Sequence, residues 1–440
     1  MFERTIELSI YTDNWIEDHK DELIEALRGA VRFRTVEGVP EEGAPFGAEV
    51  KKCLDYTLDK ASSLGLSAKS LDNYCGMIDA GEGEEMLGIL AHLDVVPEGT
   101  GWEHDPYGAE IADGKLYGRG TLDDKGPAFA SIYALKAVIA SGKSFRRRVR
   151  IILGCNEETN MGCINYYKAH ETIPDLSFSP DGEYPLTNSE KSILHCTYKA
   201  EFRSNIKMDV GDAANVVPGH ASCILSSYLK EEEISADGRI AHASLPWEGE
   251  NALQKLFLKL RSKDLRGMDR VAIDTLCDAF GNEYYGQSIG LDKEDESGRL
   301  TLNVGVMHWN SEGFELTLDL RCPVSLPELY IKERIEIALA ATGGRIAAWD
   351  YRPGYSIPDD SEIVKKLLKV YVDRTGDTEA KPKRIGGGTY SRELPNAVSF
   401  GPENYMCEAS CHVANEFIGI DQLLMNAKMI ADAIIALACD

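Results

Sequence analysis

The sequence contains no apolar run long enough to span a membrane. Its apolar runs are short, and the C-terminal IADAIIALAC is about the longest, whereas a transmembrane helix needs ~20 apolar residues. The N-terminal stretch MFERTIELSIYTDNW is charged and lacks the apolar segment of a secretory signal peptide. We therefore expect a cytoplasmic protein with no membrane partner.

Positive charge and cysteine motifs are also scarce. The 47 Lys and Arg residues are outnumbered by 72 Asp and Glu residues, which gives a net charge of −25. Such a surface repels phosphate backbones, so we expect no nucleic-acid partner. The 11 cysteines are odd in number and include no Cys-x-x-Cys motif. This pattern is typical of reduced thiols in a cytosolic protein and argues against a disulfide framework.

The pattern of predicted helices and strands changes along the 440 residues. In the first part, strands alternate with helices, which predicts an α/β sheet flanked by helices. Between about residues 191 and 351, consecutive strands predict an antiparallel sheet with helices on one face. After residue 351 the α/β pattern of the first part resumes, so we predict a second domain inserted into the first. The predicted helices cover about residues 15–31, 48–64, 127–140, 251–261, 270–280, 327–341, 361–374 and 421–438.

Side chains able to bind a metal follow three strands of the predicted α/β domain. LAHLD supplies His92 and Asp94, CNEET supplies Glu157 and Glu158, and SPDGE supplies Asp181. Ligands of open α/β sheets bind outside the carboxyl ends of the strands, so these residues are expected to converge at one crevice. Two further candidates are Asp123, in GRGTLDDKG before a helix, and His412, in the late stretch GPENYMCEASCHVANE.

Each of these residues also has an ordinary structural explanation. Asp123 suits the N-terminus of the following helix, and Asp181 suits a turn beside Gly182. Glu157 and Glu158 suit a solvated loop. The order in which all of them occur favours a shared site instead. GRGTLDD lacks the third glycine of a dinucleotide-binding loop, and it does not open a βαβ unit, which excludes that reading.

The motifs AHLDVVP, LYGRGTLDDKGP, NEE, SPDGEYP and GGGTYSRE…GPENY…H resemble the co-catalytic dizinc peptidase family of aminoacylases, carboxypeptidase G and carnosinases. The resemblance is greatest to the PepV-type dipeptidases of bacteria. It implies an α/β fold class, in which a dizinc-peptidase catalytic domain carries an inserted α+β lid domain of ferredoxin-like units. We accordingly expect the catalytic domain at residues 1–187 and 353–440, and the lid domain at residues 188–352.

The resemblance also implies a set of metal ligands. Asp123 would bridge two divalent metal ions, and its peptide bond to Asp124 would be cis. One ion would also be bound by His92 and Asp181, and the other by Glu158 and His412. Imidazole and carboxylate ligands without a thiolate suit Zn²⁺, and they also admit Mn²⁺ or Co²⁺. A shared carboxylate can hold two cations roughly 3.5–4 Å apart.

The remaining roles implied by the resemblance concern catalysis and substrate binding. Glu157 would be the general base, and Asp94 would accept the second ring N–H of His92 and so orient the ring. In the lid, His242 would stabilise the oxyanion and Arg321 would bind the substrate carboxylate. Positioning of the peptide would fall to Asn215, Gly387 and Gly388. A lid of this length suits two ferredoxin-like units in one chain, which favours a monomer over a homodimer.

The sequence points to hydrolysis of an amide bond but leaves the class of substrate open. The leading hypothesis is hydrolysis of dipeptides, and the alternative is an N-acyl amino acid amidohydrolase of aminoacylase or desuccinylase type. A non-catalytic metal-binding protein on the same fold is a third reading. The presence of Glu157 argues against it, because a metal cage needs no unligated base.

Overall fold

The chain forms two compact units in the computed structural model, which describes residues 2–227 and 230–440. The first unit comprises Met1–Asn188, Ile357–Lys383 and Thr389–Asp440, and the second comprises Ser189–Ser356 and Arg384–Gly388. The second unit thus includes a short late segment that the sequence reading placed in the catalytic domain. Main-chain hydrogen bonding explains this difference, since the Lys191 N–H donates to the Ile385 carbonyl at 3.0 Å.

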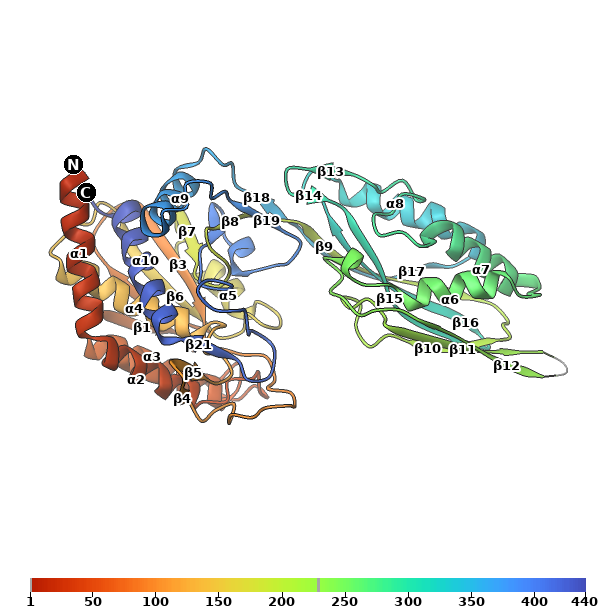
Figure 1. Ribbon diagram of the computed structural model, residues 1–440, viewed down its shortest axis with the longest axis horizontal. Coiled ribbons are helices and arrows are strands. Elements are labelled where there is room, and N and C mark those ends of the chain that lie inside the picture. The colour runs from red at the N-terminus through yellow and green to blue at the C-terminus, as the bar shows by residue number, and fades with distance from the viewer. Residues whose placement is uncertain (1, 228–229) are drawn as a thin grey trace. The chain divides into compact units, whose positions relative to one another are not determined.

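The first unit is built on a mixed sheet in the strand order β1-β2-β6-β3-β7-β20-β8 (Figure 1). Strands β3, β6, β7 and β20 run parallel to their neighbours within this group, whereas β1, β2 and β8 pair antiparallel. Every residue of β3 is buried, as expected for a central strand covered on both faces. The strand bounds are β1 Ser67–Leu71, β2 Cys75–Ala80, β3 Met86–His92, β6 Arg148–Gly154, β7 Leu176–Ser179, β8 Thr187–Glu190, β19 Lys383–Ile385 and β20 Ala397–Ser399.

Helices pack on this sheet and on one another. α4 and α10 contact each other and the central strands β3 and β6, and α3 lies against β1 and β2. α4 is buried nearly all round, which matches its apolar composition. A small sheet β21-β5-β4 pairs the two strands that precede α4 in the chain with the strand that precedes α10. The bounds are α1 Phe2–Asp18, α2 Lys20–Val31, α3 Ala48–Ser63, α4 Lys125–Ala140, α5 Gly162–His170, α9 Glu362–Thr375, η3 Tyr390–Glu393, α10 Ile420–Ala438, β4 Glu110–Ala112, β5 Lys115–Tyr117 and β21 Phe417–Gly419.

The predicted single helix over residues 15–31 is wrong. The structure has two helices there, α1 and α2, separated at His19, whose backbone has φ −109° and ψ 12°. The His19 ring stacks on Trp15 with centroids 3.8 Å apart and bonds to the Trp15 carbonyl at 2.7 Å. These contacts stabilise the break, and the alternation of apolar and charged residues on either side does not reveal it.

The second unit is an antiparallel sheet in the order β12-β11-β10-β15-β16-β9-β17, with α6 and α8 packed against its strands and α7 packed against α6 and α8. Burial along β9 alternates, because Leu194, Cys196 and Tyr198 face the helices while the residues between them face away. The bounds are β9 Ser192–Glu201, β10 Ile206–Val210, β11 His220–Ser226, β12 Glu231–Asp237, η1 Pro246–Glu248, α6 Ala252–Arg261, α7 Gly267–Phe280, β13 Glu294–Asp295, β14 Gly298–Arg299, β15 Thr301–Asn310, β16 Gly313–Cys322, α8 Glu328–Leu339, η2 Ala340–Thr342, β17 Arg345–Arg352 and β18 Tyr355–Ser356.

Within the described part of the chain, no helix has the length and apolarity required to cross a membrane.

Candidate metal centre

The carboxyl ends of β3, β6 and β7 meet at one edge of the first unit's sheet. His92 is the last residue of β3 and pairs in register with Gly154, the last residue of β6. The chain continues from β6 to Glu157 and Glu158, and from the end of β7 to Asp181. Adjacent parallel strands therefore place these side chains at the same crevice, as the strand pattern predicts.

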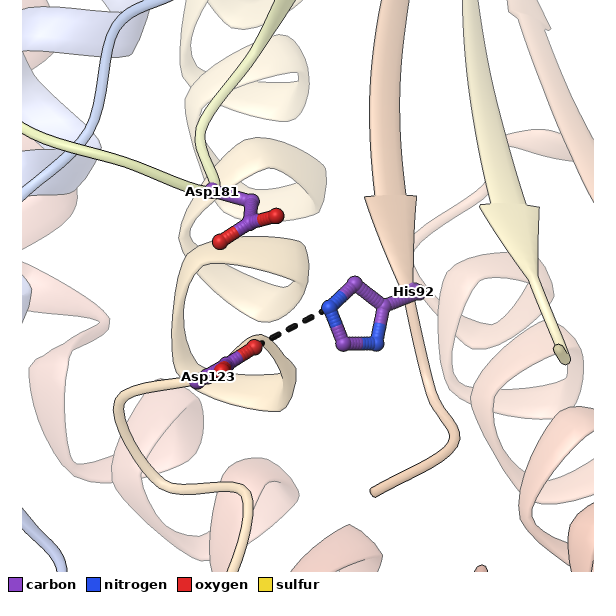
Figure 2. A group of neighbouring side chains, drawn as sticks. All are labelled: His92, Asp123 and Asp181. Carbon is purple, nitrogen blue, oxygen red and sulfur yellow. Dashed lines mark ion pairs between the residues drawn. The ribbon is translucent and has the colours of Figure 1, made fainter. Parts of the chain in front are cut away.

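Two groups of potential metal ligands form at this edge, and Asp123 belongs to both. In each group the ligand atoms lie within 4.8 Å of one another: His92, Asp123 and Asp181 form one, and Asp123, Glu158 and His412 form the other. Figure 2 shows the first group, with the His92 ring directed at the Asp123 carboxylate and Asp181 beside them. Among the described residues these are the groups of three or more that could hold an ion.

Asp123 lies between the two imidazoles. Its Oδ1 is 3.0 Å from His92 Nε2, and its Oδ2 is 2.9 Å from His412 Nε2, which also lies 3.2 Å from Glu158 Oε1. Although close to Asp123, the buried His92 Nε2 makes no hydrogen bond of good geometry. A buried ring nitrogen without a hydrogen bond, facing two carboxylates, is the arrangement that suits a metal ligand.

Asp94 contacts His92 and both glutamates through different oxygens. The acceptor for His92 Nδ1 is the Asp94 main-chain carbonyl at 3.0 Å, and the Asp94 Oδ1 is farther away at 3.7 Å. The carboxylate instead accepts the main-chain N–H groups of Glu157 and Glu158, both at 3.1 Å. One residue thus fixes the His92 ring through its backbone and the two glutamates through its side chain.

The acids of this crevice lie close together. Burial raises the pKa of Glu157 and Asp181 well above the usual range, and burial together with the Asp123 charge raises the pKa of Glu158. Asp123 behaves oppositely: although burial opposes it, the neighbouring His412 and His92 hold its pKa far below the usual value. Hydrogen bonds to Asp123 and Glu158 raise the pKa of His412 to about 11. Divalent cations would supply the positive charge that this set of acids lacks.

Glu157 lies next to Glu158 but belongs to neither group of ligands. Its side chain is half-buried, and its main-chain N–H donates to the Asp94 carboxylate. A carboxylate beside a metal site that is not itself a ligand is free to take and return a proton. Glu158 thus belongs to a potential ligand group, whereas Glu157 does not.

The other predicted residues, His242, Asn215, Arg321, Gly387 and Gly388, lie in the second unit. His242 Nδ1 bonds to Ser244 Oγ at 2.7 Å, and the Ala243 N–H donates to the Asn215 carbonyl at 2.9 Å. Arg321 donates from Nη1 to the Gly386 carbonyl at 3.0 Å, which holds the start of the triple-glycine loop. Burial, followed by the Arg321 charge, lowers the pKa of His242. These residues therefore form a local group within the second unit.

The sequence reading missed Glu416, which ends the quoted stretch GPENYMCEASCHVANE. This side chain is fully buried and bonds to the loop that carries Asp123. Burial raises its pKa to about 7. The available signal was the position of Glu416 directly before the apolar residues Phe417 and Ile418. An acid beside such residues is a candidate for burial, and a buried acid requires hydrogen-bond partners.

Comparisons with known proteins agree on one family. A model of peptidase family M20/M25/M40 matches residues 88–436. The protein YtjP of Bacillus subtilis (strain 168) is 34% identical, with 95% of this chain and 98% of that protein covered. The beta-Ala-Xaa dipeptidase of Lactobacillus delbrueckii subsp. lactis is 31% identical, with 96% and 97% covered.

Solved structures confirm the predicted fold class of an α/β domain with an inserted α+β lid domain. Human carnosine dipeptidase 1 matches with a TM-score of 0.59 at 15% identity, over 97% of this chain and 99% of that one. The dipeptidase Dug1p of Saccharomyces cerevisiae matches with a TM-score of 0.60 at 13% identity, over 97% and 98%. The family match, which spans more than half of the sequence, and the 34% identity to YtjP show that the chain belongs to peptidase family M20/M25/M40.

Proposed function

We propose that this protein is a metal-dependent dipeptidase, which hydrolyses the amide bond of small peptides. The observation that carries the proposal is the pair of His and carboxylate groups sharing Asp123, with the unligated Glu157 beside them. Family membership supports the reaction class, and the relatives named as dipeptidases support the substrate class.

The proposed centre would hold two divalent cations. His92, Asp123 and Asp181 would hold one, and Asp123, Glu158 and His412 would hold the other. The donor set of imidazoles and carboxylates suits Zn²⁺, with Mn²⁺ or Co²⁺ as alternatives. The unbonded Nε2 of His92 and the raised pKa values of the neighbouring acids support this assignment.

Glu157 acts as the general base in the proposed reaction. When bound, the cation pair would lower the pKa of a water and polarise the scissile carbonyl. Glu157 takes the proton of the attacking water and then donates it to the leaving amine. A carboxylate that lies beside the ligand groups without belonging to them can serve both steps, because no metal ion would occupy the oxygens that carry the proton.

Residues of the second unit are proposed to contact the substrate. The lowered pKa of His242 favours a neutral imidazole at pH 7, which can donate one N–H to the developing oxyanion. Arg321 is held in place by Asp319 and Gly386, as a group that binds a terminal carboxylate requires. Asn215, Gly387 and Gly388 complete the proposed set of peptide contacts.

Cellular context forms a further part of the proposal. The 11 free cysteines fit a reducing cytoplasm, where thiols persist. A seven-stranded sheet in the second unit fits a lid complete within one chain, so we propose a monomer.

The test combines metal analysis with hydrolysis assays of the purified protein. A panel of dipeptides and N-acyl amino acids should show metal-dependent release of amino acids from the dipeptides. Glu157→Gln should keep its metals while kcat falls about 10²- to 10⁴-fold, the usual contribution of a general base. Cleavage of N-acyl amino acids alone would instead identify an amidohydrolase. A Gln variant with normal turnover would remove Glu157 from its role.

A further inference from the structure

We propose that Glu416 is a positioning residue that holds the bridging Asp123 and His412 in register. The inference rests on the proposed metal centre and deepens it. It assigns a role to a buried side chain that belongs to neither group of ligands.

A single oxygen of Glu416 organises the loop that ends in Asp123. Its Oε1 accepts the main-chain N–H groups of Gly120 at 3.0 Å, Leu122 at 3.0 Å and Asp123 at 3.2 Å. Three amides directed at one carboxylate oxygen fix the backbone path of the loop, because each bond to an ionised acceptor is stronger than a neutral one. The position of the Asp123 side chain depends on that path.

Arg119 secures the other oxygen of the carboxylate. Its Nη1 donates to Glu416 Oε2 at 2.6 Å, and both side chains are almost completely buried. Arg119 also lies over the Trp102 ring, 5.3 Å from its centroid, and donates to the Glu98 carbonyl at 3.4 Å. The ion pair therefore also joins the loop that follows Asp94 in the chain.

Glu416 reaches the Asp123 loop from the segment that carries His412. It lies four residues after His412 and directly before β21, which pairs antiparallel with β5. Its main-chain carbonyl also accepts the Gly118 N–H at 2.9 Å. Glu416 thus connects Asp123 to His412, and Asp123 Oδ2 lies 2.9 Å from His412 Nε2. A buried ion pair with a purely structural role would have no need to bind the main-chain N–H of a metal ligand.

The test measures metal affinity separately from activity. Apo forms of the wild-type protein, E416A and E416Q are titrated with Zn²⁺ and with Mn²⁺ in competition with a fluorescent chelator. The matched control is D432N, which weakens the ion pair of Asp432 with Arg374, 2.5 Å apart and part-buried, away from the centre. Urea unfolding of each apo form reports how much stability each substitution removes.

We expect E416A to bind metal about 10- to 100-fold more weakly than the wild type, the range found when the partners of metal ligands are removed. E416Q turns an NH₂ group toward Arg119 and should bind metal about tenfold more weakly than the wild type. D432N should lose stability and keep its metal affinity. If E416A fails to fold, E416Q decides the question.

Wild-type metal affinity in folded E416Q, or an equal loss of affinity in D432N, would overturn the positioning role. The proposed function fails in a different way, because the wild-type protein itself would then bind no metal or cleave no dipeptide.

Discussion

Replacing Asp94 with Asn tests whether its carboxylate positions Glu157 and Glu158. The substitution keeps the size of the side chain and leaves the main-chain carbonyl that accepts from His92 in place. It changes only the group that accepts the two glutamate N–H groups, each at 3.1 Å. The effect on the two glutamates is thereby separated from the effect on the His92 ring.

The expected loss of unfolding free energy follows from the number of hydrogen-bond acceptors that the Asn side chain offers. An Asn oxygen can accept one of the two N–H groups, while its NH₂ faces the other and leaves it unpaired. The lost bond had a charged acceptor and is worth about 1.5–3 kcal/mol. Since Asp94 is only 2% exposed, water does not replace it, and Asp94→Asn should lose about 2–3 kcal/mol of unfolding free energy. Displacement of both glutamates should lower kcat about 10- to 100-fold.

The assay pairs urea unfolding with steady-state hydrolysis of a dipeptide. Asp175→Asn is the matched control, because the Asp175 carboxylate accepts the Met86 N–H at 2.8 Å, at the opposite end of β3 from His92. The control should lose some stability and keep its kcat. Unchanged turnover in Asp94→Asn, or an equal fall in both variants, would refute the reasoning.

Three further outcomes are expected. Asp123→Asn should weaken the binding of both metal ions, while Asp181→Asn and Glu158→Gln each weaken one, as metal-to-protein ratios after dialysis would show. Chelation should abolish hydrolysis and lower the melting temperature, because the ions bind the folded chain, and added Zn²⁺, Mn²⁺ or Co²⁺ should restore both. Burial opposes ionisation of Asp319, but hydrogen bonds from His195 and Arg321 give a net lowering of its pKa. The stability advantage of the wild type over Asp319→Asn should therefore be complete above the unfolded pKa of about 3.9 and be lost as pH falls through the folded pKa, measured by urea unfolding from pH 7 to pH 3.

The strand ends were readable from the sequence because they follow a simple rule. A buried parallel strand is a continuous apolar run, and a polar residue at its carboxyl end stands out against that run. His92 after MLGILA is a case of this kind. Family resemblance then suggested the pairing of residues far apart in the chain. The cis peptide between Asp123 and Asp124, which the resemblance implies, is present in the structure.

The main-chain hydrogen-bond partners could not be predicted from the sequence. That the carbonyl of Asp94 serves His92 while its carboxylate serves the glutamates depends on backbone direction, and residue identity does not encode it. The same holds for Arg384–Gly388, which joins the second unit through bonds to carbonyl groups. The break at His19 coincides with its contacts with Trp15, which the pattern of polar and apolar residues does not display.

Three buried carboxylates outside the ligand groups share one mode of action. Each accepts main-chain N–H groups from a segment that bears a ligand: Asp124 from His92 at 3.0 Å, Asp94 from Glu158 at 3.1 Å, and Glu416 from Asp123 at 3.2 Å. The acids thus divide into those that face the proposed cations and those that fix the backbone beneath them. Because the second kind acts through the backbone, it can hold a ligand in place without competing for the metal. Substitution there should change metal affinity and turnover while leaving every ligand side chain present.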